Sequence, residues 1–185
     1  MKRIVLAWVT ACLLLAGCMH TTGLDRAMEL RAQLLSGVCS FDAVITADYP
    51  DRVATFTMHC EADSGGDVTF TVLEPKSIAG ISGQIRDSGG ELTFDDLALE
   101  FGLLADGRAN PISGPWLLIK TLRDGYLTAA TEDSDGYRVT IDDSYADDAL
   151  TLDIWVDGEN LPQAAEVSWE GSRILTMELQ NFRIG

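Results

Sequence analysis

The residue whose surroundings specify its chemistry most clearly is Cys18, which closes the motif Leu-Ala-Gly-Cys. A lipoprotein signal peptidase requires this spacing before a cysteine whose thiol has been diacylated. Lys2 and Arg3 precede a short apolar run, an arrangement that is typical of a cleaved export signal. We therefore predict a lipoprotein signal peptide over residues 1–17, a diacylglyceryl anchor on Cys18, and a lipidated tether over residues 18–23.

The alternative to a cleaved signal is an uncleaved membrane anchor. A spanning helix needs about 20 apolar residues, and the apolar run from Ile4 to Ala16 is shorter. Two acyl chains are enough for stable anchoring to a membrane. With either anchor, we expect residues 24–185 to lie outside the cytoplasm on the cell membrane, or on an outer membrane if the host has one.

The charge of the chain limits its partners. Without residues 1–17 the 13 basic residues become 11 while all 29 acidic residues remain, which gives a formal charge of −18. A field of this sign repels nucleic acid and anionic lipid headgroups, so we expect no nucleic acid partner. The length of the remaining chain suits one domain with a sizeable core.

Cys39 and Cys60 are the two thiols that remain after the signal and the lipidated cysteine are set aside. Between them, Asp-Tyr-Pro-Asp at residues 48–51 is typical of a turn. A turn centred between Tyr49 and Pro50 pairs Cys39 with Cys60, Phe41 with Met58, Ala43 with Phe56 and Ile45 with Ala54, so that one face is apolar throughout. This register predicts a cross-strand disulfide that contributes roughly 3 kcal/mol. The alternative is a pair of buried free thiols.

Residues for catalysis or metal binding are sparse. The two histidines are His20 in the tether and His59 on the polar face of the hairpin, and no catalytic triad can be assembled around either. The segment from Asp133 to Gly136 contains part of a calcium loop but lacks the later bidentate acid. We therefore expect no enzyme activity, no metal and no cofactor. One alternative to this expectation is a hydrolase or a sugar-binding protein that uses the acidic loops.

The periodicity of apolar residues predicts two helices and many strands. The helices are expected at 24–35 and 116–123. Strands are expected on both sides of the first turn within 39–61, and at 68–72, 81–86, 91–94, 97–103, 126–131, 137–142, 149–157, 164–170 and 173–183. In the second hairpin Gly83 is expected opposite Phe94. In the last hairpin Val167 is expected opposite Met177, in a register that demands a three-residue loop or a bulge. Such an order suggests one strongly curved antiparallel sheet whose concave side the two helices cover.

Several segments carry a family resemblance. They are Phe-Thr-Val-Leu-Glu-Pro at 70–75, Ile-Ala-Gly-Ile-Ser-Gly at 78–83, the inserted helix at 114–123, and the closing strands through Phe182. With the leading helix and the first hairpin, they resemble the LolA/LolB and LppX-like superfamily of lipoprotein carriers over most of residues 24–185. The pairing of a lipobox with this segment order is also similar to lipoproteins of Gram-positive spore formers.

The resemblance implies an α+β fold: a curved antiparallel sheet that forms an incomplete β-barrel, with the N-terminal and inserted helices as a lid over an apolar cavity for acyl chains. An acyl chain gains about 0.8 kcal/mol for each methylene that it buries. The residues that would line this cavity are Phe41, Phe56, Met58, Phe70, Val72, Trp116, Leu152, Ile154, Trp169 and Met177. These residues could equally form a solid core, because alternation identifies a buried face without showing whether it encloses space.

Two functions follow from these alternatives. The first is a membrane-anchored, non-enzymatic envelope lipoprotein that binds acyl chains or a lipidated protein in an apolar cavity. The second is a scaffold or regulatory partner of a cell-wall enzyme, with the same fold and a filled core.

Overall fold

The computed structural model describes residues 22–49, 52–95, 97–102, 104–105 and 108–185. The predicted signal peptide at 1–17 and the predicted lipidation at Cys18 lie outside these residues. The elements are α2 (Gly23–Ser36), β1 (Cys39–Tyr49), β2 (Arg52–Ala62), β3 (Val68–Glu74), β4 (Ser82–Arg86), β5 (Gly89–Phe94), β6 (Leu97–Phe101), β7 (Leu104–Ala105), β8 (Arg108–Ala109), the 3-10 turn η1 (Pro111–Ser113), α3 (Gly114–Asp124), β9 (Tyr126–Asp133), β10 (Gly136–Asp142), β11 (Leu150–Asp157), β12 (Pro162–Trp169) and β13 (Ser172–Ile184).

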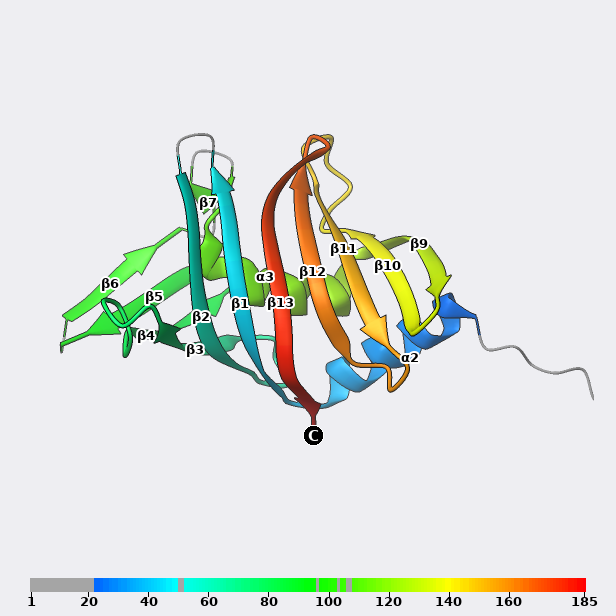
Figure 1. The fold of residues 1–185 in the computed structure, drawn as a ribbon, viewed down its shortest axis with the longest axis horizontal. Coiled ribbons are helices and arrows are strands. Elements are labelled where there is room, and N and C mark those ends of the chain that lie inside the picture. The colour runs from blue at the N-terminus through cyan, green and yellow to red at the C-terminus, as the bar shows by residue number, and fades with distance from the viewer. Residues whose placement is uncertain (1–21, 50–51, 96, 103, 106–107) are drawn as a thin grey trace, which may run out of the picture.

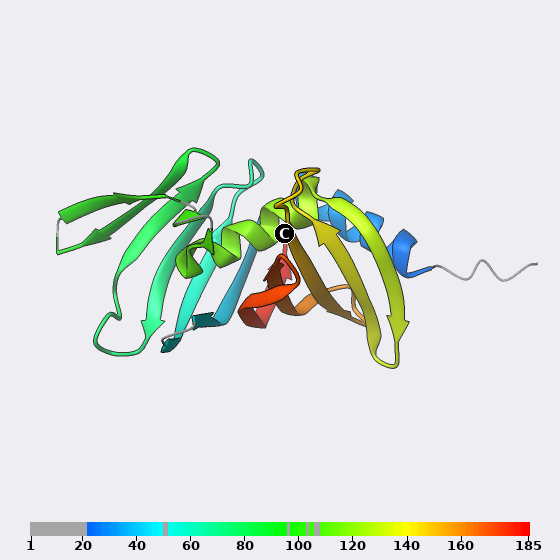
Figure 2. The ribbon, with the colours of Figure 1, turned by 90° about the horizontal axis from the view of Figure 1, so that it is seen from above.

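One antiparallel sheet of 11 strands forms the body of the described fold. Its strand order is β6-β5-β4-β3-β2-β1-β13-β12-β11-β10-β9, and β7 and β8 form a separate pair. The sheet curves into a trough that does not close, and α3 lies across the open side (Figures 1 and 2). The predicted fold class, an incomplete barrel with the N-terminal and inserted helices as a lid, is therefore confirmed.

Strict alternation along β11 shows how the sheet acquires one buried face. In β11 the four residues Leu150, Leu152, Ile154 and Val156 are buried, and the residues between them are partly exposed. Side chains alternate between the two faces of a strand, so this pattern places one apolar face on the core and one polar face in solvent. The core consists of the concave face of the sheet and the helices that cover it.

Local interactions set the start of α2 and its position on the sheet. The hydroxyl of Thr22 accepts a hydrogen bond from the Asp25 backbone N–H at 3.2 Å, and the Asp25 carboxylate accepts one from the Thr22 N–H at 3.0 Å, which forms a capping box. The hydrogen bond from the Thr22 N–H, together with one that the Thr22 hydroxyl donates to the same carboxylate at 2.8 Å, lowers the pKa of Asp25. The Arg26 guanidinium lies 4.7 Å from the centre of the Tyr137 ring and donates to the carbonyl of Asp157 at 2.6 Å. The first turns of α2 are thereby fixed against β10 and the end of β11.

The register of the first hairpin differs from the prediction by two residues. Cys39 is opposite Ala62, Phe41 is opposite Cys60, and the last pair before the turn is Tyr49 with Arg52. The predicted faces are correct, because a shift of two residues leaves each side chain on the same side of the sheet. The predicted pairing of Cys39 with Cys60 is wrong, and both cysteines are buried free thiols in this structure.

Registers were also predicted for two other hairpins, β4–β5 and β12–β13, and each of these differs from its prediction by two residues. Gly83 is opposite Leu92 instead of Phe94. Val167 is opposite Leu175 instead of Met177, and a bulge, one of the two alternatives that the prediction left open, lies between Val167 and Ser168. At the tip of this last hairpin, Glu170 and Gly171 have φ values of 48° and 75°, as a tight two-residue turn requires.

The free thiols lead to a prediction for a soluble form that begins at Thr22. Burial raises the pKa of Cys39 to about 11 and raises the pKa of Cys60 as well, so little thiolate exists at pH 8 to attack a reagent. We expect both thiols to react slowly with a disulfide reagent in the native protein, and both to react fast in 6 M guanidinium without reductant. A count of zero in the unfolded protein would show instead that the two cysteines form a disulfide.

Candidate ligand-binding site

The ten residues predicted to line a cavity all come from the concave face or from the helix that covers it. Eight of them are almost fully buried, with exposures from 0% to 6%: Phe41, Met58, Phe70, Val72, Trp116, Leu152, Ile154 and Met177. The other two, Phe56 and Trp169, are partly buried and pack against the same core. The structure therefore brings the predicted residues together into one cluster.

This cluster is packed and not hollow. A side chain beside a void as wide as a methylene chain would retain accessible surface, whereas Met58, Leu152 and Ile154 retain 0% and Phe41 and Met177 retain 1%. Helix α3 fills the trough above these side chains. Trp116, Leu117, Leu118, Ile119 and Leu122 of α3 are all at most 6% exposed, so the helix is surrounded on most of its circumference.

The entry of α3 into the trough depends on a close approach to β13. A Cβ atom added to Gly114, the first residue of α3, would lie 2.9 Å from Leu175 and 3.2 Å from the sulfur of Met177. A glycine at this position therefore lets the helix backbone contact the sheet directly. Asn110 accepts a hydrogen bond from the Ile112 N–H at 3.2 Å and so begins the short turn that leads into α3.

Two arginines join the ends of the helices α2 and α3. Arg31 of α2 donates to the carbonyls of Leu122 and Gly125, both at 2.8 Å, at the C-terminal end of α3. Arg123 of α3 donates to the carbonyl of Leu34 at 2.6 Å, at the C-terminal end of α2. Each guanidinium thus satisfies carbonyls that have no partner within a helix and places positive charge at the negative end of a helix dipole.

Arg123 also reaches the turn between β2 and β3, where it donates to the carbonyl of Ser64 at 2.7 Å. Its side chain is buried, and backbone carbonyls from two other parts of the chain accept its hydrogen bonds. This single side chain therefore connects α3, α2 and the β2–β3 turn.

The concave face continues beyond the part that α3 covers. The strands β5 and β6 extend past the N-terminal end of α3 (Figures 1 and 2). Leu92 is opposite Leu99 and Phe94 is opposite Leu97, so these four side chains share one face, which we call the apolar strip. Phe94, Leu97 and Leu99 are 45%, 74% and 62% exposed.

The apolar strip is continuous with the core. Leu92 is opposite Gly83, and Gly83 is opposite the buried Phe70. A Cβ atom at Gly83 would lie 2.8 Å from the Phe70 ring, so the ring covers this glycine. The Phe101 ring covers Gly90 in the same way. The sequence predicted these strands, but it carried no signal that their apolar face is uncovered.

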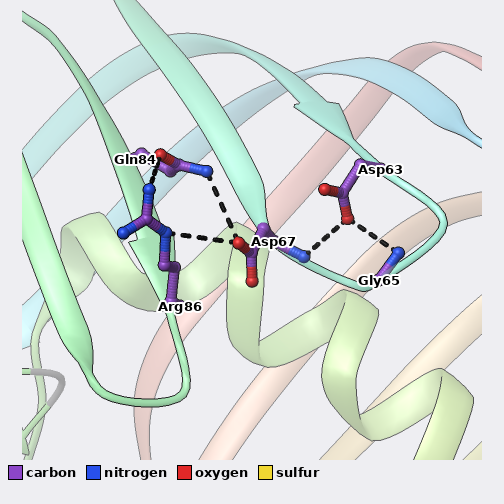
Figure 3. Close-up of polar contacts among 5 residues, drawn as sticks. All are labelled: Asp63, Gly65, Asp67, Gln84 and Arg86. Atoms are coloured by element: carbon purple, nitrogen blue, oxygen red, sulfur yellow. Dashed lines mark hydrogen bonds and ion pairs between the residues drawn. The ribbon is translucent and has the colours of Figure 1, made fainter.

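A network of polar side chains joins the C-terminal end of β4 to the start of β3 (Figure 3). The Asp67 carboxylate accepts from Gln84 at 3.5 Å and pairs with Arg86 at 3.2 Å, and Arg86 also donates to Gln84. The Asp63 carboxylate accepts from the backbone N–H groups of Gly65 and Asp67 at 2.8 and 3.0 Å. The charge of Arg86 is therefore already compensated at this end of the sheet.

A polar cluster lies on the outer face of the sheet. Asp42 and His59 form a hydrogen bond of 2.7 Å, Asn181 donates to the same carboxylate at 2.7 Å, and Glu61 lies 3.8 Å from the other ring nitrogen of His59. The bond from His59 lowers the pKa of Asp42 most. Within the described ranges no group of three or more His, Cys, Asp or Glu side chains could hold a metal ion. Among the helices that the structure describes, none has the length and apolar character needed to span a bilayer.

Comparisons with known proteins give solved structures that this chain resembles at low sequence identity. No protein-family model matches the chain, and no curated protein matches its sequence. An uncharacterised conserved protein of Thermus thermophilus is similar in structure, with 10% identity, 88% of this chain and 87% of that chain covered, and a TM-score of 0.48. A LolA superfamily protein of Nitrosomonas europaea has 12% identity, coverage of 85% and 92%, and a TM-score of 0.41. The lipoprotein LppX of Mycobacterium tuberculosis has 10% identity, coverage of 86% and 92%, and a TM-score of 0.41.

The buried arginine leads to a testable prediction about the helical cover. In Arg123→Ala the carbonyls of Leu34 and Ser64 lose their donor inside the protein, so the free energy of unfolding should fall by about 2–4 kcal/mol. Urea unfolding followed by tryptophan fluorescence measures this loss. The control is Arg173→Ala, which removes an exposed pair with Glu166 and should change stability by less than about 1 kcal/mol. Equal losses in the two variants would contradict the role given to Arg123.

Proposed function

We propose that the protein is a non-enzymatic, lipid-anchored lipoprotein of the cell envelope that binds a hydrophobic ligand, an acyl chain or a lipidated protein, on the apolar strip. The observation that carries the proposal is the continuity of the core with an uncovered apolar face. Leu92 and Phe101 pack against the core, while Leu97 and Leu99 beside them are mostly exposed. Contiguous exposed apolar surface of this kind is typical of a binding site.

The strip favours an acyl ligand because binding there needs no rearrangement. An acyl chain gains about 0.8 kcal/mol for each methylene that it removes from water, and Phe94, Leu97 and Leu99 of the strip offer it apolar surface that is already exposed. The ten residues predicted to line a cavity remain part of this proposal as a second stage. A ligand reaches the eight almost fully buried residues, Phe41, Met58, Phe70, Val72, Trp116, Leu152, Ile154 and Met177, only if α3 moves out of the trough. Phe56 and Trp169 keep some exposed surface.

The charge of the protein restricts the head of such a ligand. The chain without residues 1–17 has a formal charge of −18, which disfavours a free anionic headgroup near the strip. A neutral glyceride, or an acyl chain whose carboxyl is bound in an ester or amide of a lipoprotein, suits this field better than a free fatty acid does.

A second candidate function is a scaffold or regulatory partner of an envelope protein such as a cell-wall enzyme. The packed interior of the trough favours it, because the five apolar residues of α3 leave the covered face without accessible surface. Mass spectrometry of the protein as purified separates the two candidates. A copurified lipid supports the first, and an empty domain that carries a bound envelope protein supports the second.

The first candidate predicts the effect of a charge on the strip. In Leu99→Glu a carboxylate would contact the acyl chain, and burying that charge is unfavourable. We expect affinity for a fluorescent acyl probe with a neutral head to fall at least about tenfold, or about 1.4 kcal/mol, while the Tm is retained. Val53→Glu is the matched control, since Val53 is 65% exposed on the opposite face of the sheet. If both variants bind the probe as the parent protein does, the strip is not its binding site.

A charge inside the trough should act on stability. Met177 is 1% exposed and lies against Gly114 of α3, so in Met177→Glu a carboxylate would lie in the core without a partner. We expect the free energy of unfolding to fall by about 3–5 kcal/mol in a urea titration. A Met177→Glu protein that keeps its stability but no longer binds the acyl probe would instead show that the ligand occupies the trough itself.

A further inference from the structure

We infer that the free edge of β6 binds an extended segment of another polypeptide as an additional strand, and that this segment alternates apolar and basic residues. The inference rests on the proposed function. In that function the ligand can be a lipidated protein, and the inferred segment is the polypeptide part of such a ligand. Three observations carry it: an unpaired strand edge, an exposed apolar face on that strand, and two facing carboxylates on its other face.

The backbone of β6 is the first observation. In the described sheet β6 is the last strand, and it pairs only with β5, from Gly90 opposite Phe101 to Phe94 opposite Leu97. An edge strand presents unpaired N–H and C=O groups that another strand can bind. The opposite edge differs, because α2 packs onto β9, where Gly23 lies against Ala130 and Glu132.

The apolar face of β6 is the second observation. Leu97 and Leu99 are 74% and 62% exposed, which is unusual for leucines of a regular strand because edges with such side chains are prone to nonspecific pairing. On an added strand, the residues beside Leu99 and Phe101 would lie on the same concave face. Apolar side chains at these two positions would extend the apolar strip.

The carboxylates are the third observation. Glu100 is directly opposite Glu91, both are exposed, and neither forms an ion pair within the described part of the chain. Like charges at directly opposed positions destabilise a sheet. A lysine or arginine beside Glu100 on an added strand would remove this repulsion, and it would lie between the two apolar residues beside Leu99 and Phe101.

The surroundings of the two glutamates leave their charge uncompensated. A groove of about 420 Å³ is lined by Gln84, Arg86, Glu91, Glu100 and Phe101, together with small residues of the same strands. Arg86 is the basic residue of this groove, and Figure 3 shows it turned toward Asp67 and Gln84. The groove therefore offers net negative charge beside apolar surface, and the overall charge of the protein attracts a basic segment to it.

The test uses the protein with its lipid anchor, held in nanodiscs of phosphatidylcholine, and a fluorescent eight-residue peptide of alternating valine and lysine. We expect Glu100→Lys to weaken binding of this peptide at least tenfold and to strengthen binding of the corresponding valine and glutamate peptide. Glu159→Lys is the matched control. It changes the net charge equally at an exposed site in the β11–β12 turn, so it should weaken binding of the lysine peptide less than threefold.

A second probe tests the hydrogen bonding of the backbone. A valine and lysine peptide with an N-methyl group on every residue has no backbone N–H to donate to the edge of β6, and we expect it to bind at least tenfold more weakly than the unmodified peptide. Equal binding of the two peptides, or equal effects of Glu100→Lys and Glu159→Lys, would overturn strand addition and indicate attraction by overall charge alone.

The acyl probe separates this inference from the proposed function. Glu100→Lys should leave binding of the neutral acyl probe unchanged, because Glu100 lies on the face opposite the apolar strip. Loss of peptide recognition with intact acyl binding would therefore overturn only strand addition. If the parent protein binds the lysine peptide as inferred but does not bind the acyl probe, the ligand is a polypeptide without a lipid.

Discussion

The burial of α3 in the trough is the constraint on which the rest of the structure depends. A sheet of 11 strands with one apolar face has to cover that face, and a helix with apolar residues on nearly all sides fills it. Two arginines stabilise this arrangement. Arg31 donates to a carbonyl at the C-terminal end of α3, and Arg123 donates to one at the C-terminal end of α2. Without these donors the two carbonyls would lack a hydrogen-bond partner inside the protein. In the part of the concave face that α3 does not reach, Phe94, Leu97 and Leu99 keep much of their surface exposed.

Alternation of side chains predicted the fold well and the strand registers poorly. Each of the three hairpins has the predicted faces and a register that differs by two residues, as Cys39 opposite Ala62 illustrates. Period-two patterning cannot distinguish such registers, because both place the same residues on the core. Turn geometry makes the choice, through features such as the positive φ of Glu170 and Gly171 that composition alone does not reveal.

The candidate site was harder to predict than the fold. The ten predicted residues do form a single cluster, but whether the cluster encloses space depends on how deeply α3 enters the trough. That depth depends on the contact of Gly114 with Leu175 and Met177, which join segments far apart in the sequence. The segment from Leu97 to Phe101 reads as an ordinary strand, and its exposure follows from its place at the end of the sheet.

The pairing of β1 with β13 joins the first and last strands of the sheet at its centre (Figure 1). The two halves of the trough, β2–β6 and β9–β12, consist largely of hairpins that can form from neighbouring sequence. The two halves can pair only after β13 (Ser172–Ile184), the last strand of the chain, has become available. For a chain that crosses a membrane unfolded and emerges from its N-terminal end, β1 would remain an open edge during most of transit, and the long sequence separation of this pairing would make it the slow step of folding. Protection of β1 by another factor during export would therefore matter more for this topology than for one whose central strands are adjacent in sequence.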